Sequence, residues 1–118
     1  MSKIRIDAKF NTPTEDFSFE GFGELKKGKI LYNDKTINTK ILFSETEIEI
    51  MRRSKEYDLD CMLILDKVTE GTYIINNAGT ISLIITTKNL KIEEGLIEAE
   101  YSIENLGDFK FSINYEEI

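Results

Sequence analysis

Hydrophobic and polar residues alternate along most of the chain, most regularly between residues 71 and 90. This stretch reads GTYIINNAGTISLIITTKNL, with apolar residues two positions apart on both sides of Asn76-Asn77-Ala78-Gly79. A period of two puts every second side chain on the same face of a β-strand. Asparagine and glycine suit a tight turn, because both adopt a positive φ at little cost. The stretch therefore predicts a β-hairpin in which Ile81, Leu83 and Ile85 face the core.

The same alternation recurs along the whole chain and predicts about ten strands. The expected segments are 3–10, 16–26, 30–32, 36–43, 47–52, 59–65, 71–75, 81–85, 90–92, 96–104 and 109–115. Residues 53–58 are polar enough for an exposed loop, and no long stretch has the 3.6-residue period of a helix. Because the links are short, each strand is expected to pair with the next one along the chain.

These features predict an all-β fold: an antiparallel up-and-down β-barrel, or meander, of about 8–10 strands in a single domain over residues 1–118. A barrel of about eight strands is either filled by its own side chains or holds one small ligand. Large inward aromatic residues favour a filled barrel: Phe10, Phe17, Phe19, Phe43, Phe109 and Phe111. Small inward residues leave room for a ligand: Ala8, Gly21, Gly23, Cys61 and Ala99. Both outcomes stay open.

The chain carries 22 acidic and 15 basic residues, and its net charge of -7 disfavours binding to the phosphate backbone of nucleic acids. It has no histidine and one cysteine, so it lacks the commonest general base, the commonest metal ligand and any internal disulfide. No spacing typical of a catalytic nucleophile, a metal site or a nucleotide site stands out. We therefore expect no enzyme activity, no metal and no cofactor.

The first residues enter an alternating segment without an apolar leader, and no window approaches the length of a membrane span. The single cysteine, Cys61, lies in the apolar run LDCMLIL and is expected to be a buried structural thiol. These features favour a cytoplasmic protein that does not associate with a membrane.

Several short motifs follow one another in an order that suggests a family. They are Tyr32-x-Asp34, Ile48-x-Ile50-x-Arg52, Gly71-x-Tyr73, the alternating residues after Gly79, and Tyr101. This order resembles that of the YwiB-like proteins, a bacterial family of unknown function, over nearly the whole chain from about Gly21 onward. The resemblance implies a calycin-like, lipocalin-like β-barrel in a small cytoplasmic bacterial protein, and it implies no catalytic residues.

Arg52 is the most informative polar residue, because it shares the inward register of Ile48 and Ile50. A buried guanidinium needs an acidic or carbonyl partner. One interpretation is an internal salt bridge from Arg52 to Asp34 or Glu24. The other is a site in or at the mouth of the barrel, where Arg52 and three tyrosines bind the carboxylate or phosphate of a small amphipathic or hydrophobic ligand. The three tyrosines are Tyr32, Tyr73 and Tyr101.

A second function also stays open, namely a non-catalytic protein–protein interaction or homodimerising module with a fully packed barrel core. Its contact surface would consist of apolar residues that the alternation places on the outer face. These residues are Phe22, Leu42, Met62, Ile64, Ile74 and Ile84. Exposed apolar side chains mark an interaction site when they form one patch.

Overall fold

The computed structural model describes residues 2–118, which form ten β-strands and no helix. The strands are β1 (Ser2–Asn11), β2 (Asp16–Lys26), β3 (Lys29–Asp34), β4 (Ile37–Phe43), β5 (Glu47–Arg53), β6 (Tyr57–Ile64), β7 (Val68–Ile75), β8 (Gly79–Glu93), β9 (Leu96–Ile103) and β10 (Gly107–Glu117). Within the described residues there is no helix long and apolar enough to cross a membrane. The all-β class that the alternation predicts is confirmed.

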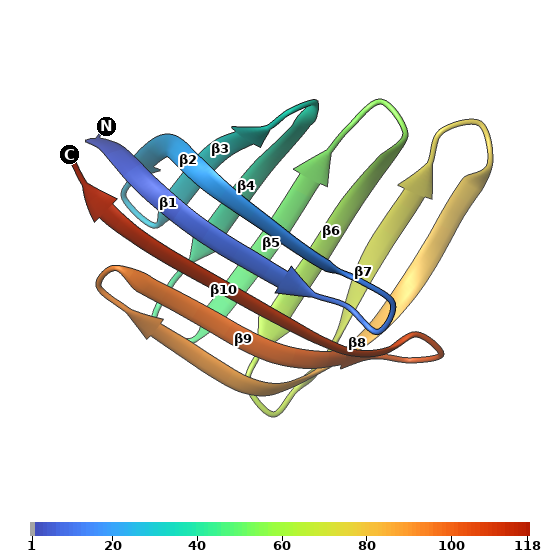
Figure 1. The fold of residues 1–118 in the computed structure, drawn as a ribbon. Coiled ribbons are helices and arrows are strands. Elements are labelled where there is room, and N and C mark those ends of the chain that lie inside the picture. The colour runs from blue at the N-terminus through green and yellow to red at the C-terminus, as the bar shows by residue number, and fades with distance from the viewer. Residues whose placement is uncertain (1) are drawn as a thin grey trace.

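The ten strands form a closed antiparallel barrel in which consecutive strands pair with one another. The barrel closes where β1 pairs with β10, for example through Ala8 and Ile113. Figure 1 shows the two chain termini side by side, with β1, β10 and β9 crossing in front of β3 to β7. This arrangement is the up-and-down meander that the sequence predicts.

Strand β8 differs from the prediction, because the segments 81–85 and 90–92 belong to one strand of 15 residues. A β-bulge between Thr87 and Asn89 shifts the register of β8 against β9. As a result Thr87 and Leu90, three positions apart, both pair with inward-facing residues of β9. A bulge accommodates one additional residue without ending the strand, so the polar interruption in the sequence did not mark a loop.

The loop predicted over residues 53–58 is shorter in the structure. Strand β5 continues to Arg53 and β6 begins at Tyr57, so that only residues 54–56 link them. Arg53 pairs with Asp58 in the β5–β6 ladder, and its guanidinium Nη2 lies 2.9 Å from Asp60 Oδ1. The charged side chains extend outward while their backbone stays in the sheet.

The core is one cluster of buried apolar residues drawn from all strands except β2 and β7. Leu83 and Ile85 are buried, as predicted. Phe17 and Ile81, which the alternation also placed inward, are 44% and 50% exposed. Both lie in the inner register but next to a hairpin link, beyond the packed part of the core, so the prediction of burial was wrong for these two residues.

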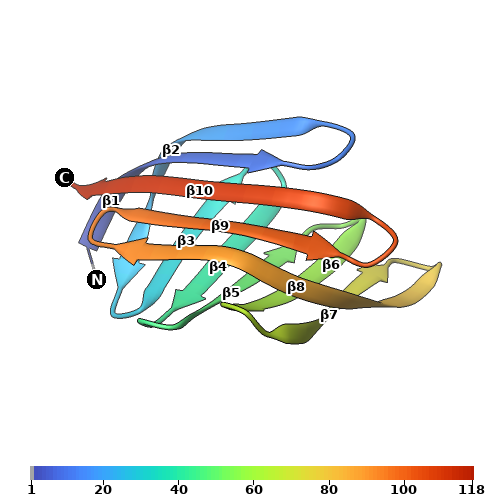
Figure 2. The same cartoon turned by 90° about the horizontal axis from the view of Figure 1, so that it is seen from below.

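The two ends of the barrel carry different links. One end holds the links that follow β1, β3, β5, β7 and β9; we call it the arginine end, because Arg52 is the penultimate residue of β5. The other end holds the remaining links and both chain termini, and we call it the terminal end. In Figure 2 the termini lie at the left, and the β7–β8 and β9–β10 links of the arginine end lie at the right.

Candidate functional site

An inward-facing row of residues crosses five neighbouring strands near the arginine end. Tyr32 of β3 pairs with Thr39 of β4, and Thr39 pairs with Arg52 of β5. The row continues from Arg52 to Leu59 of β6 and from there to Tyr73 of β7. Directly opposed residues of a β-ladder point to the same face of the sheet. Because Tyr32 and Thr39 are buried, this face is the interior, and Arg52 points inward as predicted.

The opposite wall of the barrel supplies an aromatic platform for the arginine. Arg52 Cζ lies 5.1 Å from the centroid of the Phe10 ring on β1, within the range of a cation–π contact. Phe10 itself packs against Phe111 of β10, with 5.0 Å between the ring centroids. This contact orients the guanidinium, but it supplies no hydrogen-bond acceptor.

Arg52 has no ionic partner within residues 2–118, because no carboxylate oxygen lies within 4.0 Å of its guanidinium nitrogens. Its Nε is buried and makes no hydrogen bond. The internal salt bridge to Asp34 or Glu24 was therefore a wrong prediction. Glu24 pairs with Leu31 on the outer face of the sheet, and Asp34 lies at the last position of β3.

Two tyrosine hydroxyls share the interior with Arg52. Burial raises the pKa of Tyr32 above its ordinary value of 10.0, and the nearby Arg52 charge opposes this rise. Burial also raises the pKa of Tyr101, and the Cys61 side chain adds to the rise, while Arg52 again opposes it. Both hydroxyls are therefore protonated at neutral pH and are able to donate a hydrogen bond.

Two inward threonine hydroxyls are also unsatisfied. Thr39 Oγ1 and Thr87 Oγ1 are buried and have no hydrogen-bond partner. Thr39 lies close enough to lower the pKa of Tyr32, but the two hydroxyls fall short of hydrogen-bond geometry. Thr87 is directly opposite Tyr101 in the β8–β9 ladder. On its other side, the backbone of Thr87 bonds to Asp66 and Lys67 in the β6–β7 link of the terminal end. Buried polar atoms are satisfied in the great majority of cases, so each of these unpaired hydroxyls is unusual.

The structure thus brings Arg52, Tyr32 and Tyr101 together, and it places Tyr73 farther along the row. Tyr73 is half-buried, and its ring packs against Tyr57 with 5.4 Å between the centroids. We refer to the residues facing this part of the interior as the arginine cluster. Its members are Phe10, Tyr32, Thr39, Arg52, Thr87 and Tyr101.

The sequence analysis did not single out three members of the cluster. Thr39 and Thr87 lie in the inward register of their strands, so a polar residue among inward isoleucines was a signal that could have revealed them. The contact between Phe10 and Arg52 joins residues 42 positions apart on non-adjacent strands. Only closure of the barrel creates it.

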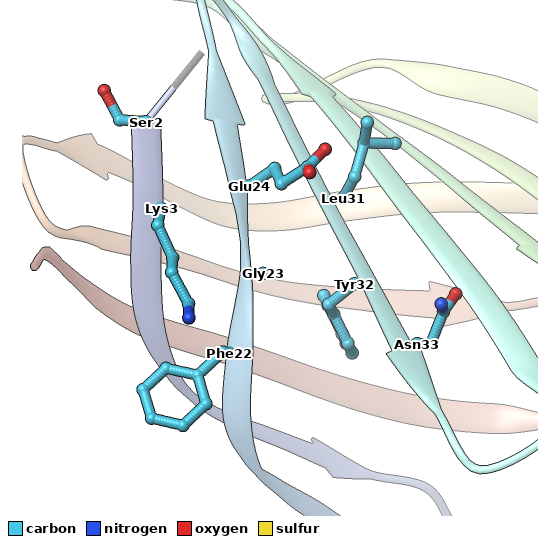
Figure 3. A pocket seen from close by; sticks show the side chains of 8 residues that line it. All are labelled: Ser2, Lys3, Phe22, Gly23, Glu24, Leu31, Tyr32 and Asn33. Atoms are coloured by element: carbon cyan, nitrogen blue, oxygen red, sulfur yellow. The ribbon is translucent and has the colours of Figure 1, made fainter.

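A separate cavity of about 560 Å³ lies where β2 and β3 diverge. Figure 3 shows its lining residues, with Lys3 and Phe22 next to each other at one side. The Lys3 ammonium is 5.1 Å from the centroid of the Phe22 ring, and the Arg5 guanidinium is 6.0 Å from it. Of the arginine cluster, only Tyr32 borders this cavity.

The apolar residues predicted on the outer face do not come from one pair of strands. They are spread over β2, β4, β6, β7 and β8. Where two of them come close in register, Glu49 separates them, because it pairs with both Leu42 and Met62. Phe22 is the most exposed of the set, at 54%.

The fold and the arginine cluster define the class: a small closed β-barrel with an unsatisfied polar cluster inside one end. No family model matches the chain, and no curated protein matches it. Its structure is similar to the crystal structure of the YwiB protein from Bacillus subtilis, with a TM-score of 0.68 and 18% sequence identity over 98% of this chain and 90% of that chain. The chain is therefore YwiB-like in fold, which confirms the barrel that the sequence resemblance implied.

Proposed function

We propose that the protein binds a small amphipathic molecule with a carboxylate head group, and that the head group lies against Arg52 inside the arginine end. The observation that carries this proposal is the buried Arg52 Nε, which has no hydrogen-bond partner. Arg52 is only half-buried as a residue, but an unsatisfied buried polar atom costs about 1–3 kcal/mol. An anionic ligand would supply the missing partner.

The composition of the cluster favours a carboxylate over a doubly charged phosphate. Arg52 is the only basic residue in the cluster, so it balances a single negative charge. A guanidinium binds the two oxygens of a carboxylate with matched geometry. The protonated hydroxyls of Tyr32 and Tyr101 provide further donors from two other walls.

The rim of the arginine end suits the apolar part of such a ligand. Leu59, Tyr73 and Phe109 are only partly buried there, and Phe17 and Ile81 are exposed. Tails of amphipathic ligands contact surfaces of this kind, while the few polar groups of a site fix the orientation. The proposed ligand therefore occupies the mouth of the barrel and leaves the terminal end filled.

The proposed role is binding without catalysis, in the cytoplasm, and without nucleic-acid or membrane partners. The absence of histidine supports binding without catalysis, because histidine is the commonest general base. The acidic composition disfavours nucleic-acid partners, and the single cysteine fits the reducing cytoplasm.

A matched pair of probes tests the head-group requirement. We expect the wild-type protein to bind 11-(dansylamino)undecanoic acid at least about 10-fold more tightly than its methyl ester, measured by dansyl fluorescence, because only the acid pairs with Arg52. Arg52→Met removes the charge but keeps the length of the side chain, so this preference should disappear. Arg53→Gln is the control, because Arg53 is outward and paired with Asp60.

Equal affinity of the acid and the ester for the wild type would contradict the proposal. So would an unchanged preference in Arg52→Met. Loss of the preference in Arg53→Gln alone would place the anion on the outer face of the sheet.

An interaction module remains the second candidate function, because Phe22, Ile74 and Ile84 are large, apolar and exposed on the outer face. Light scattering over a range of concentrations tests self-association through that face. A constant mass of one chain would exclude a homodimer, and it would leave the carboxylate proposal untouched.

A further inference from the structure

Half of strand β2 has an unpaired edge. Strand β3 pairs only with residues 23–26 of β2, from Gly23 opposite Tyr32 to Lys26 opposite Lys29. Residues 16–22 pair with β1 along one edge and with no strand along the other. In Figure 2 this part of β2 runs along the upper margin of the molecule, beyond β1.

The protection of this edge against pairing is limited to two acids, Asp16 and Glu20. Proteins commonly guard exposed strand edges with proline, lysine or a covering loop. Residues 16–22 read DFSFEGF and contain neither proline nor lysine, and two of their phenylalanines, Phe17 and Phe22, are exposed. Free backbone groups flanked by exposed aromatic side chains form a template for another strand.

The charges around the edge are self-complementary. At one end Lys3 and Arg5 lie over the Phe22 ring, at 5.1 and 6.0 Å from its centroid. At the other end are two exposed acids, Glu15 and Asp16. A two-fold axis across an antiparallel strand pair brings each basic end beside the acidic end of the other copy. An edge with this pattern therefore fits a second copy of the same chain.

Side-chain charge also selects the register of such a pair. A two-fold axis centred on Glu20 would place two like charges directly opposite each other, which is destabilising. An axis centred on Phe19 instead places Ser18 opposite Glu20 of the second copy, and Asp16 opposite its Phe22. We propose that two copies of the chain pair antiparallel along residues 16–22 of β2, with Phe19 facing Phe19.

The register also places the β1–β2 link of the second copy. The link between β1 and β2 of the second copy would lie beside the point where β3 leaves β2. That point is the cavity of about 560 Å³ in Figure 3, lined by Phe22, Gly23 and Asn33 among others. The register thus directs the link of the second copy toward this cavity.

Cysteine cross-linking reads out the register directly. In the proposed dimer the two Phe19 Cβ atoms lie close enough for a disulfide, whereas Phe17 faces Gly21 of the second copy. We expect Phe19→Cys to form a covalent dimer under mild oxidation at least about 10-fold faster than Phe17→Cys. The native Cys61 is buried and does not compete.

A charge exchange tests the same interface without touching the aromatic residues. Sedimentation velocity should show a dimer whose population grows with concentration in the wild type. Asp16→Lys and Arg5→Glu should each weaken the dimer by about 5-fold or more, because each puts two like charges beside each other across the interface. The double variant exchanges the two charges, so it should regain most of the affinity.

A wild-type protein that sediments as a monomer at every concentration would overturn the proposal. Equal cross-linking of Phe19→Cys and Phe17→Cys, or no recovery in the double variant, would also overturn it. Neither experiment involves Arg52, so failure here is distinguishable from failure of the carboxylate proposal.

Discussion

The terminal end and the arginine end of the barrel are built from the same alternating strands, yet they differ in packing. Near the terminal end a layer of fully buried aliphatic side chains lies beneath the partly buried Leu25, Phe43, Ile92 and Tyr115. The members of this layer are Ile4, Ile30, Ile48, Leu63, Ile97 and Ile113. Near the arginine end the inward residues include Arg52, Tyr32 and Tyr101, and two buried polar atoms, Thr39 Oγ1 and Arg52 Nε, have no hydrogen-bond partner. The terminal end contributes stability by apolar burial, whereas the arginine end gives up part of that contribution.

The difference supports our proposal that a ligand binds at the arginine end. Arg52 is half-buried, and its buried Nε has no hydrogen-bond partner, which costs stability. Arg52 lies among residues where Leu or Met would fit the pattern of the neighbouring strands. In our proposal, the carboxylate of a ligand would satisfy the Nε of Arg52.

The largest expected effect is the loss of stability when a buried isoleucine near the terminal end is truncated. Ile48→Ala removes methyl and methylene groups from a fully buried site, so the free energy of unfolding should fall by about 2–5 kcal/mol. Ile81→Ala changes a half-exposed side chain at the arginine end and should lower it by about 1 kcal/mol or less. Urea denaturation followed by circular dichroism measures both. Equal losses would mean that the two ends are packed alike.

An intermediate effect is expected from alkaline pH. Burial raises the pKa of the Cys61 thiol from 9.0 to about 12, and nearby Asp60 adds to the rise. A group whose pKa is higher in the folded chain holds its proton more tightly there, so its contribution is complete below pH 9 and is lost as the pH rises toward 12. Each such group contributes a slope of at most about 1.4 kcal/mol per pH unit.

Cys61→Ala is the variant that isolates this contribution. Between pH 9 and 10 its free energy of unfolding should fall less steeply than that of the wild type. The difference in slope should be at most about 1.4 kcal/mol per pH unit, the value for one titrating group. The residual slope should come from Tyr32 and Tyr101, whose pKa values are also raised by burial. Urea midpoints measured at several pH values provide the data. Identical slopes for the two proteins would show that Cys61 is accessible to solvent.

The smallest effect concerns Arg52 itself. Arg52→Met loses the contact with Phe10 but relieves an unpaired buried nitrogen, so the free energy of unfolding without ligand should change by less than about 1 kcal/mol in either direction. Thermal or urea denaturation measures this change. A loss of more than about 2 kcal/mol would reveal an internal partner and would favour the salt bridge that the structure lacks.

The sequence by itself determined the architecture. A period of two puts the apolar residues of each strand on one face, and that face is buried when the sheet folds around it. Alternating segments with short links favour pairing as consecutive hairpins, and the twist of such a sheet leads to closure. The same period placed Arg52 and Tyr32 inside, since orientation within a strand depends only on local register.

Only the tertiary structure decided which groups meet across the interior and which remain unpaired. The contact of Arg52 with Phe10, the lack of an acid beside it, and the exposure of Ile81 depend on barrel width, strand stagger and hairpin length. The bulge in β8 and the early departure of β3 from β2 are likewise invisible in an alternating pattern. Periodicity fixes the side of the sheet on which a residue lies, whereas partners across the barrel are set by the three-dimensional closure of all ten strands.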